Sequence, residues 1–254
     1  MEKTNKLRHF DYFDKIKSCL EESSSKILEI YNDFDQSISF KYDESPLTRA
    51  DIASHNLINT CLKSISPYPV ISEESENFYI TEKKYWLVDP LDGTKEFINK
   101  NGEFTINIAL IEDQFPTLGY VYSPIKKILY VGGLHKRSFK IYDSNIDELL
   151  VSSPNDPLRI VASRSHMNDE TQKFISQFQN YELLQAGSSI KFCMIAEGSA
   201  DIYPRLAPTS EWDTAAAQAI VEGAGGSVKD LNGQRLTYQK ENILNPFFIV
   251  QGKI

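Results

Sequence analysis

One stretch of the sequence joins a short apolar strand to an acidic turn. Residues 86–88 read Trp-Leu-Val and favour a buried strand. Asp89 then begins a turn in which Pro90 fixes φ and Gly93 allows a backbone conformation that a Cβ would oppose. Such a turn can direct Asp89 and Asp92 to one point, and Mg²⁺ prefers oxygen ligands of this kind. Asp, Pro and Gly also dominate ordinary turns, so these two acids alone leave both interpretations open.

Two amphipathic helices are predicted before this stretch. Apolar residues at helical spacing indicate the first over residues 7–31. Thr48 is a good N-cap, and Asp51 follows it by three positions, as in a capping box, so a second helix begins there. Pro67 ends that helix. Capping is therefore one interpretation of Asp51.

The segments after the acidic turn predict a mostly antiparallel sheet, because short β-rich runs alternate with turn residues. These strands cover residues 104–112, 119–122, 128–131 and 138–142. Residues 143–157 are rich in Asn, Asp, Ser and Pro and are the best linker candidate.

The last hundred residues alternate between strands and helices, which favours a layered α/β region. The strands are expected at residues 160–163, 181–184, 200–203, 227–231 and 247–251, and the helices at 168–178, 188–197 and 213–223. We therefore predict an N-terminal α+β region over residues 1–150, with a mostly antiparallel sheet and the metal-binding acids. An α/β region over residues 151–254 would complete the site.

Composition limits the partners and the setting. The net charge of −8 over 254 residues argues against a nucleic-acid polymer as partner. Cys19, Cys61 and Cys193 are far apart, which argues against a disulfide framework and for a reducing compartment. No apolar run approaches the ~18 residues of a membrane helix. We predict a cytoplasmic protein; peripheral inner-membrane association, and the choice between monomer and homodimer, stay open.

Four acids share one local setting: each follows a strand or begins a helix, where ligand sites of α/β folds gather. They are Glu73, Asp89, Asp92 and Asp213. Without a neighbouring His or Cys, such a set disfavours zinc and favours Mg²⁺ or Mn²⁺. Acidic sites with several metal ions serve phosphoryl chemistry. Two bland interpretations stay open: a solvated loop at Glu73, and capping by Asp213 with Ser210.

Other catalytic patterns are missing from the sequence. It contains no P-loop and no G-x-G-x-x-G motif. Of its four histidines only His166 lies in a motif-like setting, and no Ser elbow accompanies it. The acids therefore remain the best candidates for chemistry.

Three motifs resemble the inositol monophosphatase superfamily of Mg²⁺-dependent, lithium-sensitive phosphatases. They are Glu73-Glu74, Asp89-Pro90-Leu91-Asp92-Gly93-Thr94 and Trp212-Asp213, in that order. The resemblance covers about residues 41–251. It implies an α+β/α/β chain folded as the layered αβαβα sandwich of the inositol monophosphatase and fructose-1,6-bisphosphatase type.

Within that superfamily the chain is most similar to the bacterial 3'(2'),5'-bisphosphate nucleotidases of the CysQ type, which belong to sulfur metabolism. The segments that carry this similarity are residues 95–97, 101–105, 163–166, 187–193, 203–205 and 208–214.

The resemblance also implies roles for individual residues. The first metal ion would be held by Glu73, Asp89 and the Leu91 carbonyl, and the second by Asp89, Asp92 and Asp213. A third, weaker ion would lie between Glu73 and waters near Asp51. Thr94, supported by Asp51, would orient and deprotonate the attacking water.

For the substrate, the resemblance implies contacts on two sides of the pocket. The Gly93 and Thr94 amides would meet the scissile phosphate, near Glu73, Asp92 and Asp213. The nucleoside and second-phosphate side would be lined by Gly187, Ser188, Lys191 and Glu211, with Lys95 favouring a nucleotide and with Arg164 and Arg205 as further candidates. Lys191 could equally be a solvated surface lysine.

The implied activity is hydrolysis of the 3'-phosphate of 3'-phosphoadenosine 5'-phosphate to AMP and phosphate. A metal-activated water would attack directly, with two or three Mg²⁺ ions and no phospho-enzyme. Two alternatives stay open. One is an inositol monophosphatase or another sugar-phosphate phosphatase of the same superfamily, and the other is a non-catalytic regulator that binds a nucleotide or Mg²⁺.

Overall fold

The computed structural model describes residue 7 and residues 10–33, 38–40, 46–76, 78–164 and 167–253. Its helices are α2 (Phe13–Tyr31), α3 (Arg49–Ile65), α4 (Thr94–Ile98), α5 (Asp169–Ile175), α6 (Ile190–Ala196) and α7 (Glu211–Gly223). Its strands are β1 (Ile38–Phe40), β2 (Pro46–Thr48), β3 (Val70–Ser72), β4 (Lys84–Asp92), β5 (Thr105–Glu112), β6 (Phe115–Ser123), β7 (Ile128–Gly133), β8 (Lys136–Tyr142), β9 (Asn145–Leu149), β10 (Leu158–Ser163), β11 (Tyr181–Ala186), β12 (Ile202–Arg205), β13 (Ser227–Asp230) and β14 (Phe248–Gln251).

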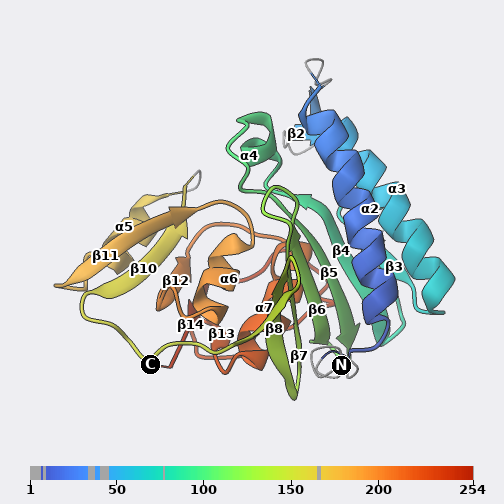
Figure 1. The fold of residues 1–254 in the computed structure, drawn as a ribbon. Coiled ribbons are helices and arrows are strands. Elements are labelled where there is room, and N and C mark those ends of the chain that lie inside the picture. The colour runs from blue at the N-terminus through green and yellow to red at the C-terminus, as the bar shows by residue number, and fades with distance from the viewer. Residues whose placement is uncertain are drawn as a thin grey trace.

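These elements form the expected αβαβα sandwich (Figure 1). Helices α2 and α3 cover one face of a seven-stranded sheet of order β3-β4-β5-β6-β7-β8-β9. Helices α6 and α7 lie between this sheet and a five-stranded sheet of order β11-β10-β12-β14-β13, and α5 covers the far face of the second sheet. All pairs of the first sheet are antiparallel except β3–β4, which confirms the mostly antiparallel prediction.

Strand β4 is buried on both faces because it has a helical layer on each side. Trp86 and Val88 belong to the apolar cluster under α2 and α3, whereas Tyr85 and Leu87 belong to the cluster around α7. Successive side chains of a strand point to opposite faces, so a continuous apolar run is what this position requires.

Helix α7 lies unusually close to the seven-stranded sheet. A Cβ on Gly119 of β6 would lie 2.0 Å from the Ala216 carbonyl oxygen, so only glycine fits there. A Cβ on Gly132 of β7 would likewise lie 2.8 Å from Ile220 Cα of α7. This close packing fixes the height of α7 above the sheet, and with it the position of Asp213 near its N-terminus.

Several local predictions need correction. The first helix begins at Phe13, not at residue 7, although Leu7 is buried. Residues 145–149 form β9, so a third of the predicted linker is a strand. Its polar sequence is tolerated because β9 is an edge strand with exposed side chains.

Besides β9, three elements were not predicted: β1, β2 and the five-residue helix α4. Their short length gives no periodic signal. The predicted division at residue 150 falls between the two sheets, since β9 ends at Leu149 and β10 begins at Leu158. One apolar cluster nevertheless takes residues from both sheets, and the division into domains stays a prediction.

A buried ion pair stabilises the five-stranded sheet. Asp201 is 1% exposed and accepts hydrogen bonds from the Arg159 guanidinium at 2.8 and 3.2 Å and from the Arg159 backbone N–H at 2.8 Å. Burial acts to raise the pKa of this carboxyl, but the bonds from Arg159, Ser152 and Asn155 hold it well below its usual range.

Replacing Asp201 by Asn should therefore destabilise the fold by about 2 kcal/mol at neutral pH, since hydrogen bonds to a buried charge are lost. A carboxyl with a depressed pKa stabilises the folded state above its unfolded pKa of about 4, and the contribution is lost as the pH falls further. The difference between wild type and Asp201→Asn should thus shrink below about pH 4. Urea unfolding across pH measures it, with the exposed pair Arg137–Glu148 as control through Glu148→Gln. A pH-independent difference would contradict this account.

Candidate active site

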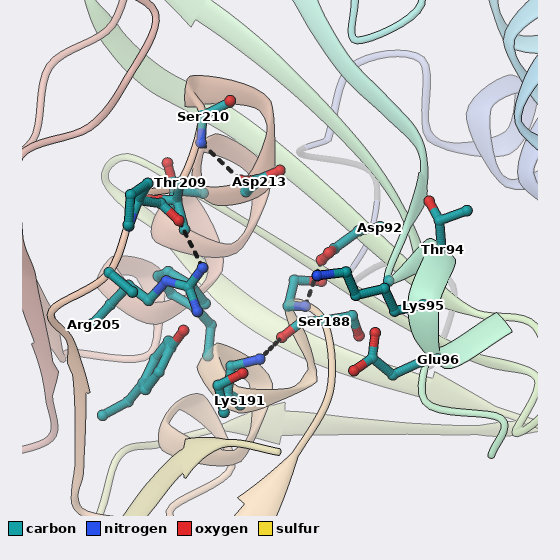
Figure 2. Close-up of a pocket in the computed structure, with 18 of the residues that line it drawn as sticks. Asp92, Thr94, Lys95, Glu96, Ser188, Lys191, Arg205, Thr209, Ser210 and Asp213 are labelled. Atoms are coloured by element: carbon teal, nitrogen blue, oxygen red, sulfur yellow. Dashed lines mark hydrogen bonds between the residues drawn. The ribbon is translucent and has the colours of Figure 1, made fainter. Parts of the chain in front are cut away.

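A cavity of about 470 Å³ lies where the two sheets and α7 meet. Figure 2 shows that its walls come from distant parts of the chain: Asp92, Thr94 and Lys95 on one side, Ser188 and Lys191 below, and Arg205, Ser210 and Asp213 on the other. Glu73 also lines it. The structure thus brings together most of the residues that the sequence singled out.

The two acids of the turn reach one side because β4 is irregular there. Asp89 pairs with Asn107 of β5, and Asp92 pairs with Thr105, so the register shifts by one residue between them. In a regular strand, residues three apart point to opposite faces. The extra residue returns Asp92 to the face of Asp89, as a bulge does.

Asp213 completes the group from the other side of the cavity. Carboxylate oxygens of Asp89, Asp92 and Asp213 lie within 4.8 Å of one another. Asp213 Oδ2 also accepts a 2.7 Å hydrogen bond from the Ser210 backbone N–H. The capping interpretation of Asp213 is therefore confirmed. The same carboxylate also belongs to the acidic group.

Burial and the proximity of like charges raise the pKa values of these carboxyls. Burial, followed by the charges of Glu73 and Asp92, raises the pKa of Asp89 well above its usual range. Burial, followed by Asp92 and Glu73, raises the pKa of Asp213 to about 7. The group offers only carboxylate oxygens as ligands, and these repel one another when charged. A hard divalent cation prefers such ligands and would offset the repulsion.

Two further predicted ligands lie beside this group. Glu73 follows β3, whose parallel pairing with β4 sets Ser72 opposite Val88, and the Glu73 N–H donates to the Val88 carbonyl at 3.0 Å. The Leu91 N–H donates to Asp89 Oδ1 at 3.0 Å, so the backbone of this segment fixes the Asp89 carboxylate. Which ion each oxygen would hold stays a prediction.

Thr94 and Asp51 are joined across 43 positions of sequence. Thr94 Oγ1 donates to Asp51 Oδ1 at 3.2 Å, while Asp51 Oδ2 accepts from the Thr48 N–H at 2.8 Å and from the Thr48 hydroxyl at 2.5 Å. Asp51 is 1% exposed. The capping interpretation of Asp51 is confirmed: one oxygen caps α3 and the other accepts from Thr94. Its part in catalysis stays a prediction.

The basic residues differ in their surroundings. Lys191 is 4% exposed, so it is not the solvated surface lysine of the alternative interpretation; its Nζ donates to the Ser188 carbonyl at 2.5 Å. Burial lowers the pKa of Lys191 to about 8. Lys95 and Arg205 line the same cavity. Arg164 is absent from its lining and instead pairs with Glu103 at 2.9 Å.

Two predicted substrate residues lie away from the cavity wall. Glu211 does not line it: its carboxylate accepts from the backbone N–H groups of Gln239 and Lys240 and from Lys240 Nζ. Gly187 is buried and packs against Glu96 and Glu103. Ser165 and His166 lie outside the described residues.

Sequence reasoning gave no role to several residues that the structure brings to the site. Glu96 is 4% exposed and lines the cavity, as does Tyr203. Asn107 donates to Asp92 Oδ2 at 3.2 Å, and the Ser189 N–H donates to the same oxygen at 2.5 Å. Glu96 belongs to the segment of residues 95–97 that resembles the nucleotidases, and this is the one sequence signal that points to a role for it.

The comparisons agree with this fold. The model of the inositol monophosphatase family matches residues 14–247, and the chain belongs to this family. It is similar to the 3'(2'),5'-bisphosphate nucleotidase CysQ of Salmonella typhimurium, with 46% identity over 83% of the chain and 87% of the relative. The enzyme of the same name from Escherichia coli K12 is 40% identical over 93% of the chain and 98% of the relative.

A solved structure supports the same grouping. CysQ from Bacteroides thetaiotaomicron, described as a bacterial member of the inositol monophosphatase family, matches with a TM-score of 0.85 and 39% identity, covering 96% of this chain and 99% of that one. Within the described part of the chain, the helices are too short or too polar to cross a membrane.

Proposed function

We propose that this chain hydrolyses the 3'-phosphate of 3'-phosphoadenosine 5'-phosphate, releasing AMP and phosphate. The observation that carries the proposal is the group of three carboxylates within 4.8 Å, with the Thr94–Asp51 pair next to it. The choice of substrate is supported by relatives at 46% and 40% identity that bear the name 3'(2'),5'-bisphosphate nucleotidase.

The acidic group suits Mg²⁺. Glu73, Asp89 and the Leu91 carbonyl would hold one ion, and Asp89, Asp92 and Asp213 another. Bound there, Mg²⁺ would lower the pKa of a water molecule and stabilise charge on the leaving ribose oxygen. The protein supplies the fixed positions of these oxygens, through the bulge of β4 and the packing of α7.

Thr94 would take part in the proton transfer. Its hydroxyl proton is directed at Asp51 Oδ1, which leaves the Oγ1 lone pairs to accept a hydrogen bond from the attacking water. Asp51 Oδ1 then receives the proton that leaves Thr94 as water is deprotonated. The water attacks phosphorus directly, in line with the ribose oxygen, and no phospho-enzyme forms.

The basic side chains that line the cavity would hold the rest of the nucleotide. Lys95, Lys191 and Arg205 offer donors to the 5'-phosphate, which inositol phosphate lacks. Ser188 lies between Asp92 and Lys191 (Figure 2). We leave Glu211 out of this assignment, because its carboxylate is already engaged by Lys240.

Parallel assays of phosphate release test the substrate. We expect kcat/KM on 3'-phosphoadenosine 5'-phosphate to exceed that on inositol 1-phosphate by about 100-fold, the effect of two additional charge-assisted contacts of about 1.4 kcal/mol each. AMP, which keeps only the 5'-phosphate, is the control and should release none. Faster hydrolysis of inositol 1-phosphate would assign the chain to the other branch of the family.

A further inference from the structure

The turn between β11 and α6 is held by charged side chains at three successive residues. The Gly187 N–H donates to Glu103 Oε2 at 2.8 Å. The Ser189 N–H donates to Asp92 Oδ2, and the Ser188 carbonyl accepts from Lys191 Nζ, each at 2.5 Å. The backbone around Ser188 is therefore fixed from three directions.

This turn needs external support because its middle residue is strained. Ser188 has φ of +45°, a left-handed conformation that side chains other than glycine rarely adopt. Such strain persists where surrounding contacts over-determine it, and it concentrates at functional sites. Ser188 lines the cavity, so its conformation decides what the cavity presents there.

Glu103 is itself held firmly, although it does not line the cavity. Arg164 binds both of its carboxylate oxygens, with Nε at 3.0 Å from Oε2 and Nη2 at 2.9 Å from Oε1. Arg164 Nη2 also donates to the Gln185 carbonyl of β11 at 3.1 Å. Glu103 comes from the loop before β5, so this pair connects the seven-stranded sheet to the edge of the five-stranded sheet.

The turn around Gly187 packs closely against the segment that carries Glu103. A Cβ on Gly187 would lie 2.6 Å from Glu96 Cγ and 2.8 Å from the Glu103 carbonyl oxygen. The turn therefore lies directly on the segment that carries Glu103, and any movement of that carboxylate changes the support of Ser188.

We propose that Glu103 is a positioning residue, which holds the Gly187 N–H so that Ser188 and Lys191 face the bound nucleotide; the nucleotide itself rests on the proposed function. The hydrogen bonds of the Glu103 carboxylate go to Arg164 and to the Gly187 N–H. Loss of its carboxylate leaves the Asp92–Ser189 bond and the Thr94–Asp51 pair in place. Its effect therefore falls on substrate affinity and not on the chemical step.

The test compares variants of Glu103 in the full chain. For Glu103→Ala we expect KM for 3'-phosphoadenosine 5'-phosphate to rise about ten-fold, with kcat within about two-fold of wild type. Glu103→Gln keeps an acceptor for the Gly187 N–H and loses the charge, so its KM should lie between the two. Amide hydrogen exchange in the peptide that contains Gly187 should quicken about ten-fold in Glu103→Ala without any ligand present.

A charge swap separates positioning from simple stabilisation. The double variant Glu103→Arg with Arg164→Glu restores an ion pair but removes the acceptor for Gly187. We expect its melting temperature to recover and its KM to stay high. The matched control is Glu148→Gln, which removes the charge of Glu148, whose two oxygens both accept from Arg137 Nη1 between β8 and β9; it should leave KM unchanged.

The outcomes distinguish the two proposals. Wild-type KM and wild-type exchange at Gly187 in Glu103→Ala would overturn the positioning role, as would a swap that restores KM together with the melting temperature. A wild-type protein that releases no phosphate from the nucleotide would refute the proposed function, and the exchange at Gly187 would then decide the role of Glu103 by itself.

Discussion

Replacing Asp89 by Asn should lower phosphate release by about 1,000-fold, or about 4 kcal/mol of transition-state stabilisation. Asp89 belongs to both proposed ion sites, so its charge matters most. The substitution is also gentle: an amide oxygen can still accept from the Leu91 N–H. Because Asp89 is buried beside Glu73, Asp92 and Asp213, a neutral group there removes repulsion, and the metal-free fold should be as stable as wild type or more so.

Thermal unfolding with and without Mg²⁺ provides the second readout for Asp89→Asn. A ligand at 100 times its Kd stabilises the folded state by about 2.7 kcal/mol. Mg²⁺ should therefore raise the melting temperature of wild type and hardly change that of the variant. Full activity of wild type in excess EDTA, or equal stabilisation of both proteins by Mg²⁺, would contradict the metal assignment.

Removal of the Thr94 hydroxyl should reduce kcat by about 100- to 10,000-fold, the usual contribution of a positioned proton-transfer group. Thr94→Ala deletes the donor to Asp51 Oδ1 and leaves Asp51 bound to Thr48, so α3 keeps its cap. KM should change little, because the phosphate and nucleotide contacts remain.

The matched control for this effect is Thr94→Ser, which keeps the hydroxyl and loses one methyl group. Steady-state kinetics should place its kcat within about ten-fold of wild type. If Ala and Ser variants lose activity equally, the methyl group and its packing, rather than proton transfer, would explain the loss.

Local patterns in the sequence predicted the parts of the site that are local in structure. The apolar run at residues 86–88 and the Thr48 cap each depend on a few neighbouring residues, and the structure has both. The turn predicted from Asp89 onward is wrong, because residues 89–92 still pair with β5 and form the irregular end of β4. The resemblance extended this to Asp213, which no local pattern connects with Asp89. The resemblance also predicted the layered fold.

Contacts between distant residues could not be predicted from patterns. Ser189 and Asp92 are 97 positions apart, and Gly187 and Glu103 are 84 apart, so only the packing of the two sheets brings them together. Glu211, which the resemblance assigned to the substrate side, is a second example. It lies two residues before Asp213 in α7, where successive side chains point in different directions, and its carboxylate is bonded to Lys240.

The position of α7 between the sheets has a consequence for folding. Asp89 and Asp92 belong to the first sheet, whereas Asp213 is carried by a helix that packs on both. A cation bound by all three therefore recognises only a chain whose two halves have already docked. Cation affinity then adds directly to the free energy of docking, because neither half can bind the ion as tightly alone. Chains in which the two sheets have not yet packed against α7 would therefore lack catalytic activity.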